Sequence, residues 1–251
     1  MLHWLKRHPF PVSAFFRHSL VLTYAYPAEL LSPMLPPGLV LDTMRGYGFL
    51  TIALVQAERL RPTFLPEAFG RDVFLAGCRI FARRGDSRSL RGLRILHSLT
   101  NRRWMWCAGN LFTRYRYRVC RTQLREHAGG LRWSVRTRRG DADLDLEVPF
   151  ADRPAPLPEG SPFISDQEAR RFAGPLPYTF DYEPETASIV SIRGVRSQWN
   201  PRPVRVIVRR NTFLNQPPIG GCDPLLANAF YLRDVPYRWD RGVRTPIGGL
   251  R

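Results

Sequence analysis

Two arginines and one histidine lie in segments that are otherwise apolar. Arg79 falls within VFLAGCRIFAR (73–83), and Arg94 and His97 fall within a second strand-like segment at 90–98. An arginine inside a folded core is costly unless it meets a carboxylate or an anionic ligand. We therefore predict a pocket in which these arginines bind a carboxylate or phosphate bidentately. The alternative is that strand parity turns them toward solvent. Candidate partners are Asp42, Glu58 and Asp72.

His97 and Glu58 are the candidate proton carriers of such a pocket. The pKa of a histidine lies near working pH, so His97 could act as a general acid or base. A lone histidine at the end of a strand is more often structural, and this alternative stays open. The five histidines form no close pair and the four cysteines are scattered, so we expect neither a sequence-local metal site nor a cofactor.

Asn110 is a further candidate for ligand binding. It follows Gly109 in the apolar stretch 104–120, which we predict to be a strand. In that position its amide either points into the interior or serves a bulge beside the glycine.

Two segments combine arginines with aromatic residues. The run RYRYR at 114–118 resembles a surface on which single-stranded nucleic acid stacks. Its alternation instead predicts a half-buried strand, with Tyr115, Tyr117 and Val119 on one face and the arginines on the other. Later in the chain, Arg193, Arg196 and Trp199 suit either a loop clamp for an anion or a salt-bridged corner, and the sequence does not choose between them.

The charge balance is strongly basic. Formal net charge is +17, and all but one of the 38 lysine and arginine residues are arginine. Such a field favours anionic small molecules and polyanions. The arginines are spread over almost every segment, which indicates a bias of the whole chain. A basic binding module for nucleic acid or other polyanions is therefore the alternative function.

The 251 residues, 44% of them hydrophobic, supply enough apolar material for a sizeable core. No window is apolar for long enough to predict a membrane-spanning helix, and the first residues lack the apolar run of a secretory signal. We therefore expect a cytoplasmic protein with no membrane partner. Oligomeric state is not predicted.

Short strands recur along the whole chain, which predicts a mainly β architecture in a single domain, 1–251. Predicted strands cover 18–26, 47–58, 73–83, 90–98, 104–120, 131–138, 142–148, 176–182, 187–194 and 203–209. A helix is expected after Pro27, and Ser165 begins a capping-box-like start to a second helix at 166–172. The segment 224–232 fits either a strand or a short helix.

Several sequence blocks resemble the YqjF-like family of the acetoacetate decarboxylase-like superfamily. The longest are HPFPVSAFFRHSLVLTYAYPAELLSPMLPPGLVLD (8–42), GYGFLTIALVQAERLRP (46–62) and LANAFYLRDVPYRW (226–239). Together with LAGCRIFAR, LRGLRIL, GNLFTRYRYR and SIRGVRSQWNPRPV, they span most of the chain. The resemblance implies a mainly antiparallel β-barrel around a central pocket.

The resemblance does not extend to the decarboxylase chemistry. That reaction needs a lysine amine that forms a Schiff base. The paired lysines of the decarboxylase fall near Asn101-Arg102-Arg103, and its pocket glutamate falls near Leu50. A guanidinium stays protonated and forms no imine, although Asn101 and Arg102 remain candidates for ligand binding. The one lysine, Lys6, lies before the first strand, where most lysines are solvated.

We therefore predict a pocket protein for a small anionic carboxylate or carbonyl compound that is not an acetoacetate decarboxylase. Whether it is an enzyme stays open; any chemistry would be non-covalent acid–base work.

Overall fold

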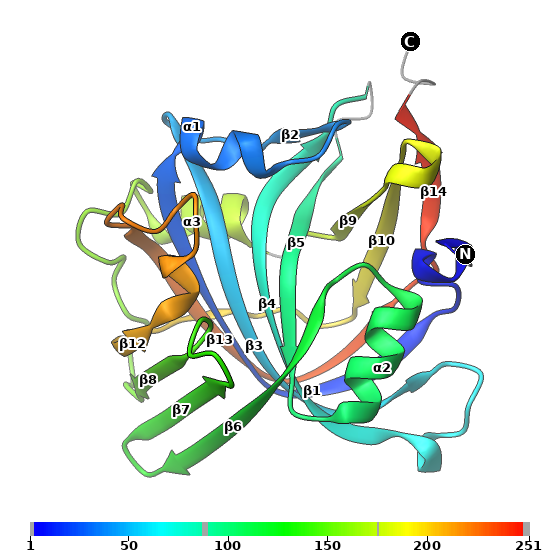
Figure 1. Ribbon diagram of the computed structural model, residues 1–251. Helices are drawn as coiled ribbons and strands as arrows, with labels where there is room; N and C mark the ends of the chain where they lie inside the picture. Colours follow the sequence, from blue (N-terminus) through cyan, green and yellow to red (C-terminus); the bar gives the residue numbers. More distant parts are fainter. Residues whose placement is uncertain (1–2, 87–89, 175, 248–251) are drawn as a thin grey trace.

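Four long antiparallel strands form the back of the molecule, because their sequences are almost continuously apolar or β-branched. The computed structural model describes residues 3–86, 90–174 and 176–247. The long strands are β1 (Val12–Pro27), β3 (Tyr47–Pro62), β4 (Arg71–Arg84) and β13 (Leu225–Trp239). They lie side by side in the order β13-β1-β3-β4 (Figure 1). The segment 224–232, which the sequence left open, is therefore a strand.

Three more strands close this sheet into a ring. They are β5 (Arg91–Thr100), β9 (Tyr178–Glu183) and β10 (Ser188–Arg196). β5 pairs with β4 on one side and with β9 on the other, and β10 links β9 to β13. The pairings of β5 with β9 and with β6 (Tyr117–His127) are parallel, so the sheet is mixed where we expected an antiparallel one.

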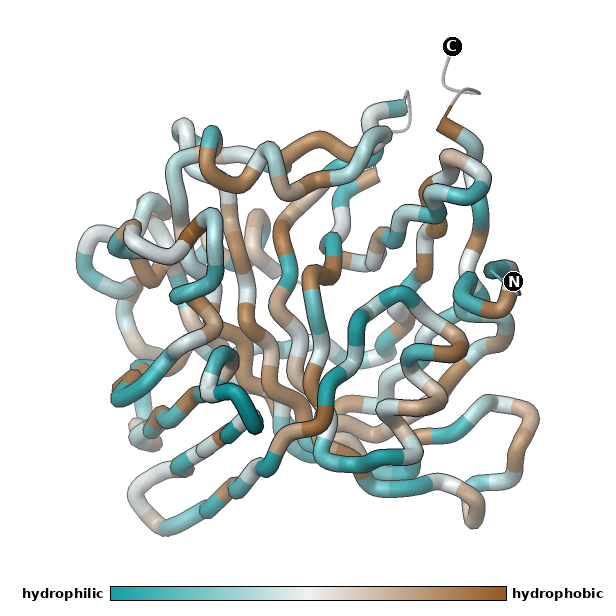
Figure 2. Tube along the Cα trace, viewed as in Figure 1, coloured by the Kyte–Doolittle hydropathy of each residue, from teal (hydrophilic) through white to brown (hydrophobic). Residues whose placement is uncertain are grey.

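An arm of strands packs over the outer face of the ring. It contains β6, β7 (Gly130–Thr137), β8 (Leu144–Pro149) and β12 (Ile207–Asn211). Figure 2 shows hydrophobic and hydrophilic residues alternating along these strands. The apolar members, such as Trp133 and Leu146, pack with Leu20 and Leu22 of β1 in the largest hydrophobic cluster. The outward-facing residues of the ring strands are thereby buried, and the residues between them face the interior. The short strands are β2 (Leu39–Leu41), β11 (Arg202–Pro203) and β14 (Val243–Pro246).

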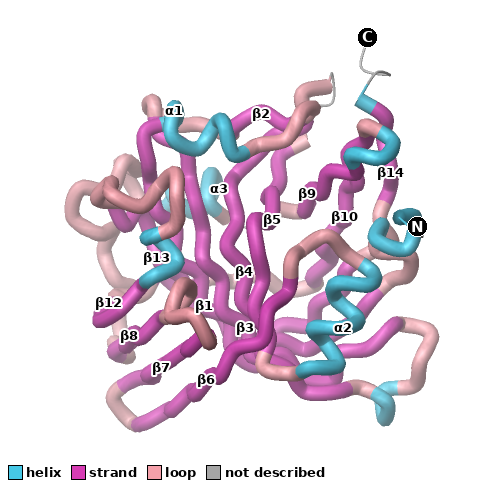
Figure 3. Tube along the Cα trace, in the orientation of Figure 1, coloured by secondary structure: helices cyan, strands magenta, loops and turns pink. Residues whose placement is uncertain are grey.

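Helices are few and short (Figure 3). They are α1 (Ala28–Leu31), α2 (Arg103–Phe112) and α3 (Asp166–Ala173), with 3-10 turns at His3–Arg7, Ser32–Met34, Glu67–Phe69, Pro184–Thr186 and Thr212–Asn215. At α3 the hydroxyl of Ser165 accepts a hydrogen bond from the backbone N–H of Glu168, which confirms the predicted cap. No helix in the described ranges is long and apolar enough to cross a membrane.

The predicted strand over 104–120 is wrong in its first half, which forms α2. Trp104, Ala108 and Phe112 recur every fourth residue and line the same cavity, so the stretch has helical periodicity. The second half differs in detail. Arg116 has a left-handed backbone (φ 51°), and Val119 is exposed, so it does not share the buried face of Tyr115.

The mainly β class with a few short helices is confirmed by the observed elements. Strands from both sides of the Pro-rich segment at 149–162 pair with each other, as a single domain requires: β12 with β8, and β9 with β5. The single domain over 1–251 stays a prediction.

Candidate functional site

A cavity with a volume of about 270 Å³ lies inside the ring, between the interior faces of the strands and helix α2. By the same measure, one water needs only about 10–15 Å³. The wall is mostly apolar and aromatic. Its described residues include arginines, tyrosines and one histidine, but no aspartate, glutamate or lysine. The cavity therefore has a positive interior with no acidic residue to balance it.

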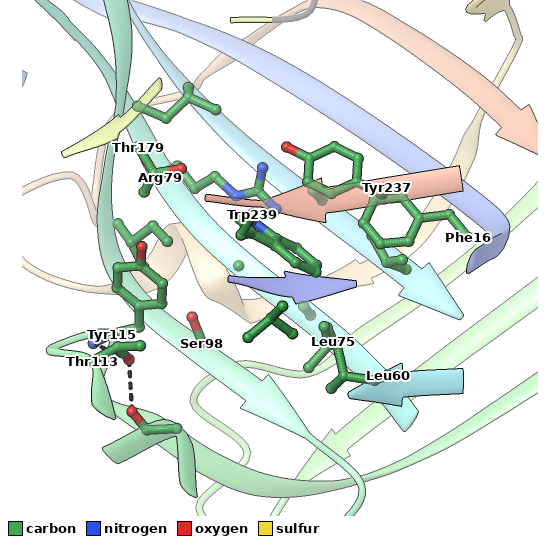
Figure 4. Close-up of a pocket in the computed structure, with 18 of the residues that line it drawn as sticks. Phe16, Leu60, Leu75, Arg79, Ser98, Thr113, Tyr115, Thr179, Tyr237 and Trp239 are labelled. Atoms are coloured by element: carbon green, nitrogen blue, oxygen red, sulfur yellow. Dashed lines mark hydrogen bonds between the residues drawn. The ribbon is translucent and has the colours of Figure 1, made fainter. Parts of the chain in front are cut away.

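Arg79 supplies the central charge of the cavity (Figure 4). It lies on β4 beside a register shift at Cys78/Arg79, opposite Thr51 of β3. A Cβ on Gly77 would lie 2.9 Å from Nε of Arg79, so the glycine leaves room for the folded-over side chain. Among the described residues, Nε of Arg79 has no hydrogen-bond partner and the guanidinium has no carboxylate partner.

The electrostatic surroundings of Arg79 are phenols. Burial lowers the pKa of its guanidinium, and the nearby hydroxyls of Tyr237, Tyr117 and Tyr115 oppose that shift. An arginine stays protonated even so. The charge therefore stays in the cavity, and its neighbours in the described chain are the neutral phenols and the thiol of Cys78.

The phenol groups of these three tyrosines keep their protons at neutral pH and can donate hydrogen bonds. Burial raises the pKa of Tyr117 to about 12 and raises the pKa values of Tyr115 and Tyr237. The hydroxyl of Tyr115 is buried and has no partner among the described residues. Tyr117 is fixed by Asn110, whose side chain accepts from its N–H (2.9 Å) and donates to its carbonyl (3.0 Å).

A second arginine enters the cavity wall from the end of β10. The guanidinium of Arg196 lies 4.3 Å from the ring centroid of Trp199, a cation–π arrangement. Burial lowers its pKa, and a hydrogen bond with Tyr237 opposes this. Tyr237 fits because position 194 is glycine: a Cβ on Gly194 would lie 2.0 Å from its hydroxyl oxygen. Of the two alternatives for this segment, a salt-bridged corner is not what forms, since Arg196 has no carboxylate partner in the described ranges.

His8 is the histidine of the cavity wall. Its backbone N–H donates to the carbonyl of Phe112, and its own carbonyl accepts from Gly242, which holds the N-terminal segment against α2. Burial lowers the pKa of the imidazole to about 4, and Nδ1 has no hydrogen-bond partner in the described chain. At neutral pH the ring is therefore uncharged and can accept a proton.

Arg94 lies outside the cavity wall. Its guanidinium forms an ion pair with Asp181 and donates to the carbonyl of Phe180 at 3.3 Å. The side chain thus has a carboxylate from the chain itself, and none of the three predicted partners supplies it. Asp42 instead binds Arg83 and Arg91, each at 2.6 Å.

The two predicted proton carriers are also elsewhere. His97 lies on the other face of β5, stacked on Phe213 with ring centroids 5.6 Å apart. Burial lowers its pKa to about 4, and Nε2 has no partner among the described residues. Glu58 binds Arg17 at 2.9 Å on the outside of the ring.

The remaining predicted residues have structural contacts. Asn101 accepts a hydrogen bond from the backbone N–H of Phe74 at 2.9 Å. Arg102 is exposed at the start of α2. Asn110 holds Tyr117 without lining the cavity itself. Of Arg79, Arg94, Asn101, Arg102 and Asn110, Arg79 alone lines the cavity, and Arg196 and Trp199 of the possible loop clamp line it too.

Sequence reasoning missed His8, Tyr237 and the role of the tyrosine pair 115 and 117. The alternation of the pair was visible, but it was assigned to packing. His8 and Tyr237 come from the two ends of the chain, and no local pattern connects them to Arg79. They could have been found only by predicting how the strands pair to close the ring, because that pairing brings both ends of the chain to Arg79.

Metal and thiol chemistry have little support in the described ranges. No group of three or more His, Cys, Asp or Glu side chains there could hold a metal ion. Cys107 and Cys222 are exposed, and Cys78 and Cys120 are buried, where burial raises each pKa to about 12. Buried thiols of this kind are poor nucleophiles.

Known structures with the same fold are acetoacetate decarboxylase-like. Acetoacetate decarboxylase from Legionella pneumophila matches with a TM-score of 0.63 at 11% identity, over 94% of this chain and 88% of that one. An acetoacetate decarboxylase-like enzyme from Sphingomonas wittichii RW1 matches with a TM-score of 0.63 at 14% identity, over 96% and 95%. The enduracididine biosynthesis enzyme MppR complexed with pyruvate matches with a TM-score of 0.60 at 10% identity, over 94% and 90%.

These likenesses confirm the predicted fold, and identities this low show the fold alone. No curated protein matches the sequence significantly. A family model, DUF2071, described as an uncharacterized conserved protein, matches residues 13–223, and the chain belongs to this family.

Proposed function

We propose that the protein binds a small anionic carboxylate or carbonyl compound in the ring cavity, with Arg79 as the anion-binding residue. The observation that carries this proposal is the guanidinium of Arg79, which lines the cavity without a carboxylate partner among the described residues. An unpaired buried charge is costly, and a bound anion would remove that cost. The planar guanidinium also matches a carboxylate with two parallel hydrogen bonds.

The phenols support a carbonyl or carboxylate ligand. Tyr115 and Tyr237 present neutral hydroxyl groups near Arg79. Such groups can donate to a second oxygen of the ligand without adding charge. MppR, whose fold is similar, was solved with the keto acid pyruvate, and this also favours a small acid.

Imine chemistry is not part of the proposal. Lys6 is exposed on the first 3-10 turn and does not line the cavity, and the sequence has no other lysine. Any acid–base step within the cavity would use His8 or the phenols, because His97 and Glu58 lie outside its wall. His8 is neutral at neutral pH, and its pKa of about 4 makes it a weak proton acceptor there.

The test is a calorimetric titration of pyruvate and butanoate into the purified protein, its Arg79→Met variant and two matched controls. We expect Arg79→Met to weaken binding at least tenfold, since a hydrogen bond to a charged group contributes about 1.5–3 kcal/mol. Arg102→Met, which removes an exposed arginine, and Arg94→Met, which removes a paired one, should bind normally if they remain folded. Equal affinity in the wild type and Arg79→Met would overturn the proposal.

No specific observation favours the polyanion alternative. Within 114–118, Arg114 contacts Glu185 at 2.6 Å and Arg118 contacts Asp141, so two of the three arginines are already paired. The net charge alone predicts weak, unspecific binding that disappears at physiological salt.

A further inference from the structure

The two sides of the cavity differ in chemistry. Arg79, Tyr237 and Thr179 lie toward one side, whereas Leu60 and Leu75 lie on the opposite side, beyond Trp239 (Figure 4). Met105 of α2 packs in the same hydrophobic cluster as Leu60 and Leu75. We call the space bounded by Leu60, Leu75, Met105, Ala108 and Phe112 the apolar compartment; all five residues line the cavity.

The apolar compartment makes the cavity too large for a short acid. An apolar cavity of about 150 Å³ holds a benzene molecule, which has six non-hydrogen atoms, so about 270 Å³ has room for roughly eleven. Pyruvate, with six non-hydrogen atoms, would fill about half of it. The remaining space is lined by hydrocarbon, and filling it with apolar atoms is favourable because water is displaced from both surfaces.

The other two arginines of the described cavity wall already have contacts within the chain. Nε of Arg61 donates to the carbonyl of Leu65 and Nη1 to the carbonyl of Arg59, each at 3.2 Å. Arg196 is stacked on Trp199 and bound to Tyr237. A second carboxylate at the distal end of the ligand would therefore lose its water and would have to compete with these contacts for a guanidinium.

Resting on the proposed function, we infer that the ligand is a hydrophobic monocarboxylate: its carboxylate binds Arg79, and an aliphatic or aryl tail of about six to ten carbons fills the apolar compartment. Tyr237 helps to orient the carboxylate. Because its oxygen interacts with Arg196, its own proton is free to be donated to the anion. Arg196 thus acts as a positioning residue through Tyr237.

The experiment is a calorimetric series of straight-chain acids from acetate to decanoate, with octanedioate as the doubly charged control. Each added methylene should raise affinity about fourfold until the compartment is full, which follows from about 0.8 kcal/mol per buried CH2. Octanedioate should bind at least tenfold more weakly than octanoate. A flat length profile, or equal binding of octanedioate and octanoate, would overturn the inference.

Two variants separate this inference from the proposed function. Ala108→Phe fills the apolar compartment and should weaken octanoate at least tenfold more than it weakens butanoate. Cys107→Phe adds the same ring at the adjacent exposed position and should change neither. Met105→Trp is a second filling variant if Ala108→Phe melts early. Arg79→Met should weaken every chain length, and length-dependent binding that survived it would overturn the proposed function instead.

Discussion

The outer arm and the ring interior both contain arginines on paired strands, but their charges are balanced differently. On the arm, Arg132 and Arg136 each lie 3.1 Å from a carboxylate oxygen of Asp145. In the interior, Arg79 has only phenols near it, and the described cavity wall offers no carboxylate. Asp145 thus supplies the counter-charge on the arm, and under the proposed function the ligand supplies it for Arg79.

The same distinction applies to the two sequence-predicted arginines. Arg94 and Arg79 occupy neighbouring strands in similar apolar sequence, yet Arg94 pairs with Asp181 and Arg79 with no residue in the described ranges. Arginine content alone therefore does not identify a binding site. A binding site is identified by what pairs with each arginine.

The largest expected effect on stability is at a paired site. Asp42 is fully buried and binds both Arg83 and Arg91, each at 2.6 Å. Asp42→Asn would leave two guanidinium groups without their counter-charge, and breaking a buried ion pair from one side costs about 3–5 kcal/mol. Both arginines are partly exposed, so we expect a loss near 3 kcal/mol in the free energy of unfolding, measured by urea denaturation.

Glu126→Gln is the control for that measurement. Glu126 pairs with Arg233 at 3.0 Å, and both side chains are at least 40% exposed. A surface pair of this kind contributes less than about 1 kcal/mol. If both variants lost the same stability, burial would not be what distinguishes the paired sites.

A smaller effect is expected from His97 on the outer face of the ring. Its folded-state pKa of about 4 lies below its unfolded value. At a pH between the two values the unfolded chain therefore binds a proton at His97 and the folded chain does not. Stability is therefore lost as pH falls from about 6.5 to 4, and the part lost between pH 7 and pH 5 is on the order of 2 kcal/mol. Arg118, Asp141 and Arg116 are the charged groups that act on this ring, and the arginines lower its pKa further.

His97→Gln should remove this part of the pH dependence. The measurement is the free energy of unfolding at pH 7 and pH 5, above the range in which the carboxyl of Glu183, with its pKa of about 2, is protonated. His127→Gln, at an exposed histidine of β6, is the matched control and should retain the wild-type slope. An unchanged slope in His97→Gln would mean that the folded and unfolded chains bind a proton at His97 equally.

Local features of the fold were predictable from sequence, because local patterns determine them. The hairpin of β6 and β7 turns at Ala128-Gly129, within the glycine-rich junction that the sequence shows there, and Ser165 caps α3. Helix α2 was missed because its tryptophans and phenylalanine also favour strands, and the aromatic content outweighed the four-residue spacing. A strand and a helix built from these residues differ in sequence only in the spacing at which the apolar residues recur.

The candidate site was less predictable, because it is assembled from distant segments. Arg79 could be singled out as a charge within an apolar strand. Tyr237 and His8 reach it only when β13 and the N-terminal segment close the ring, and no spacing in the chain encodes that closure. The paired state of Arg94 likewise depends on Asp181, which β9 brings beside β5.

The smallest expected change in stability is at Arg79. It best distinguishes an arginine that is paired with a carboxylate of the chain from one that is not. Arg79→Met keeps the length of the side chain and removes a guanidinium that stabilises no carboxylate of the described chain. Replacing a poorly compensated charge by a hydrophobic residue is often neutral or stabilising. We expect the free energy of unfolding without ligand to stay within about 1 kcal/mol of wild type or to rise. A loss as large as that of Asp42→Asn would show that Arg79 has a structural partner and is not a vacant anion site. Unchanged stability combined with lost octanoate binding would assign the charge of Arg79 to the ligand.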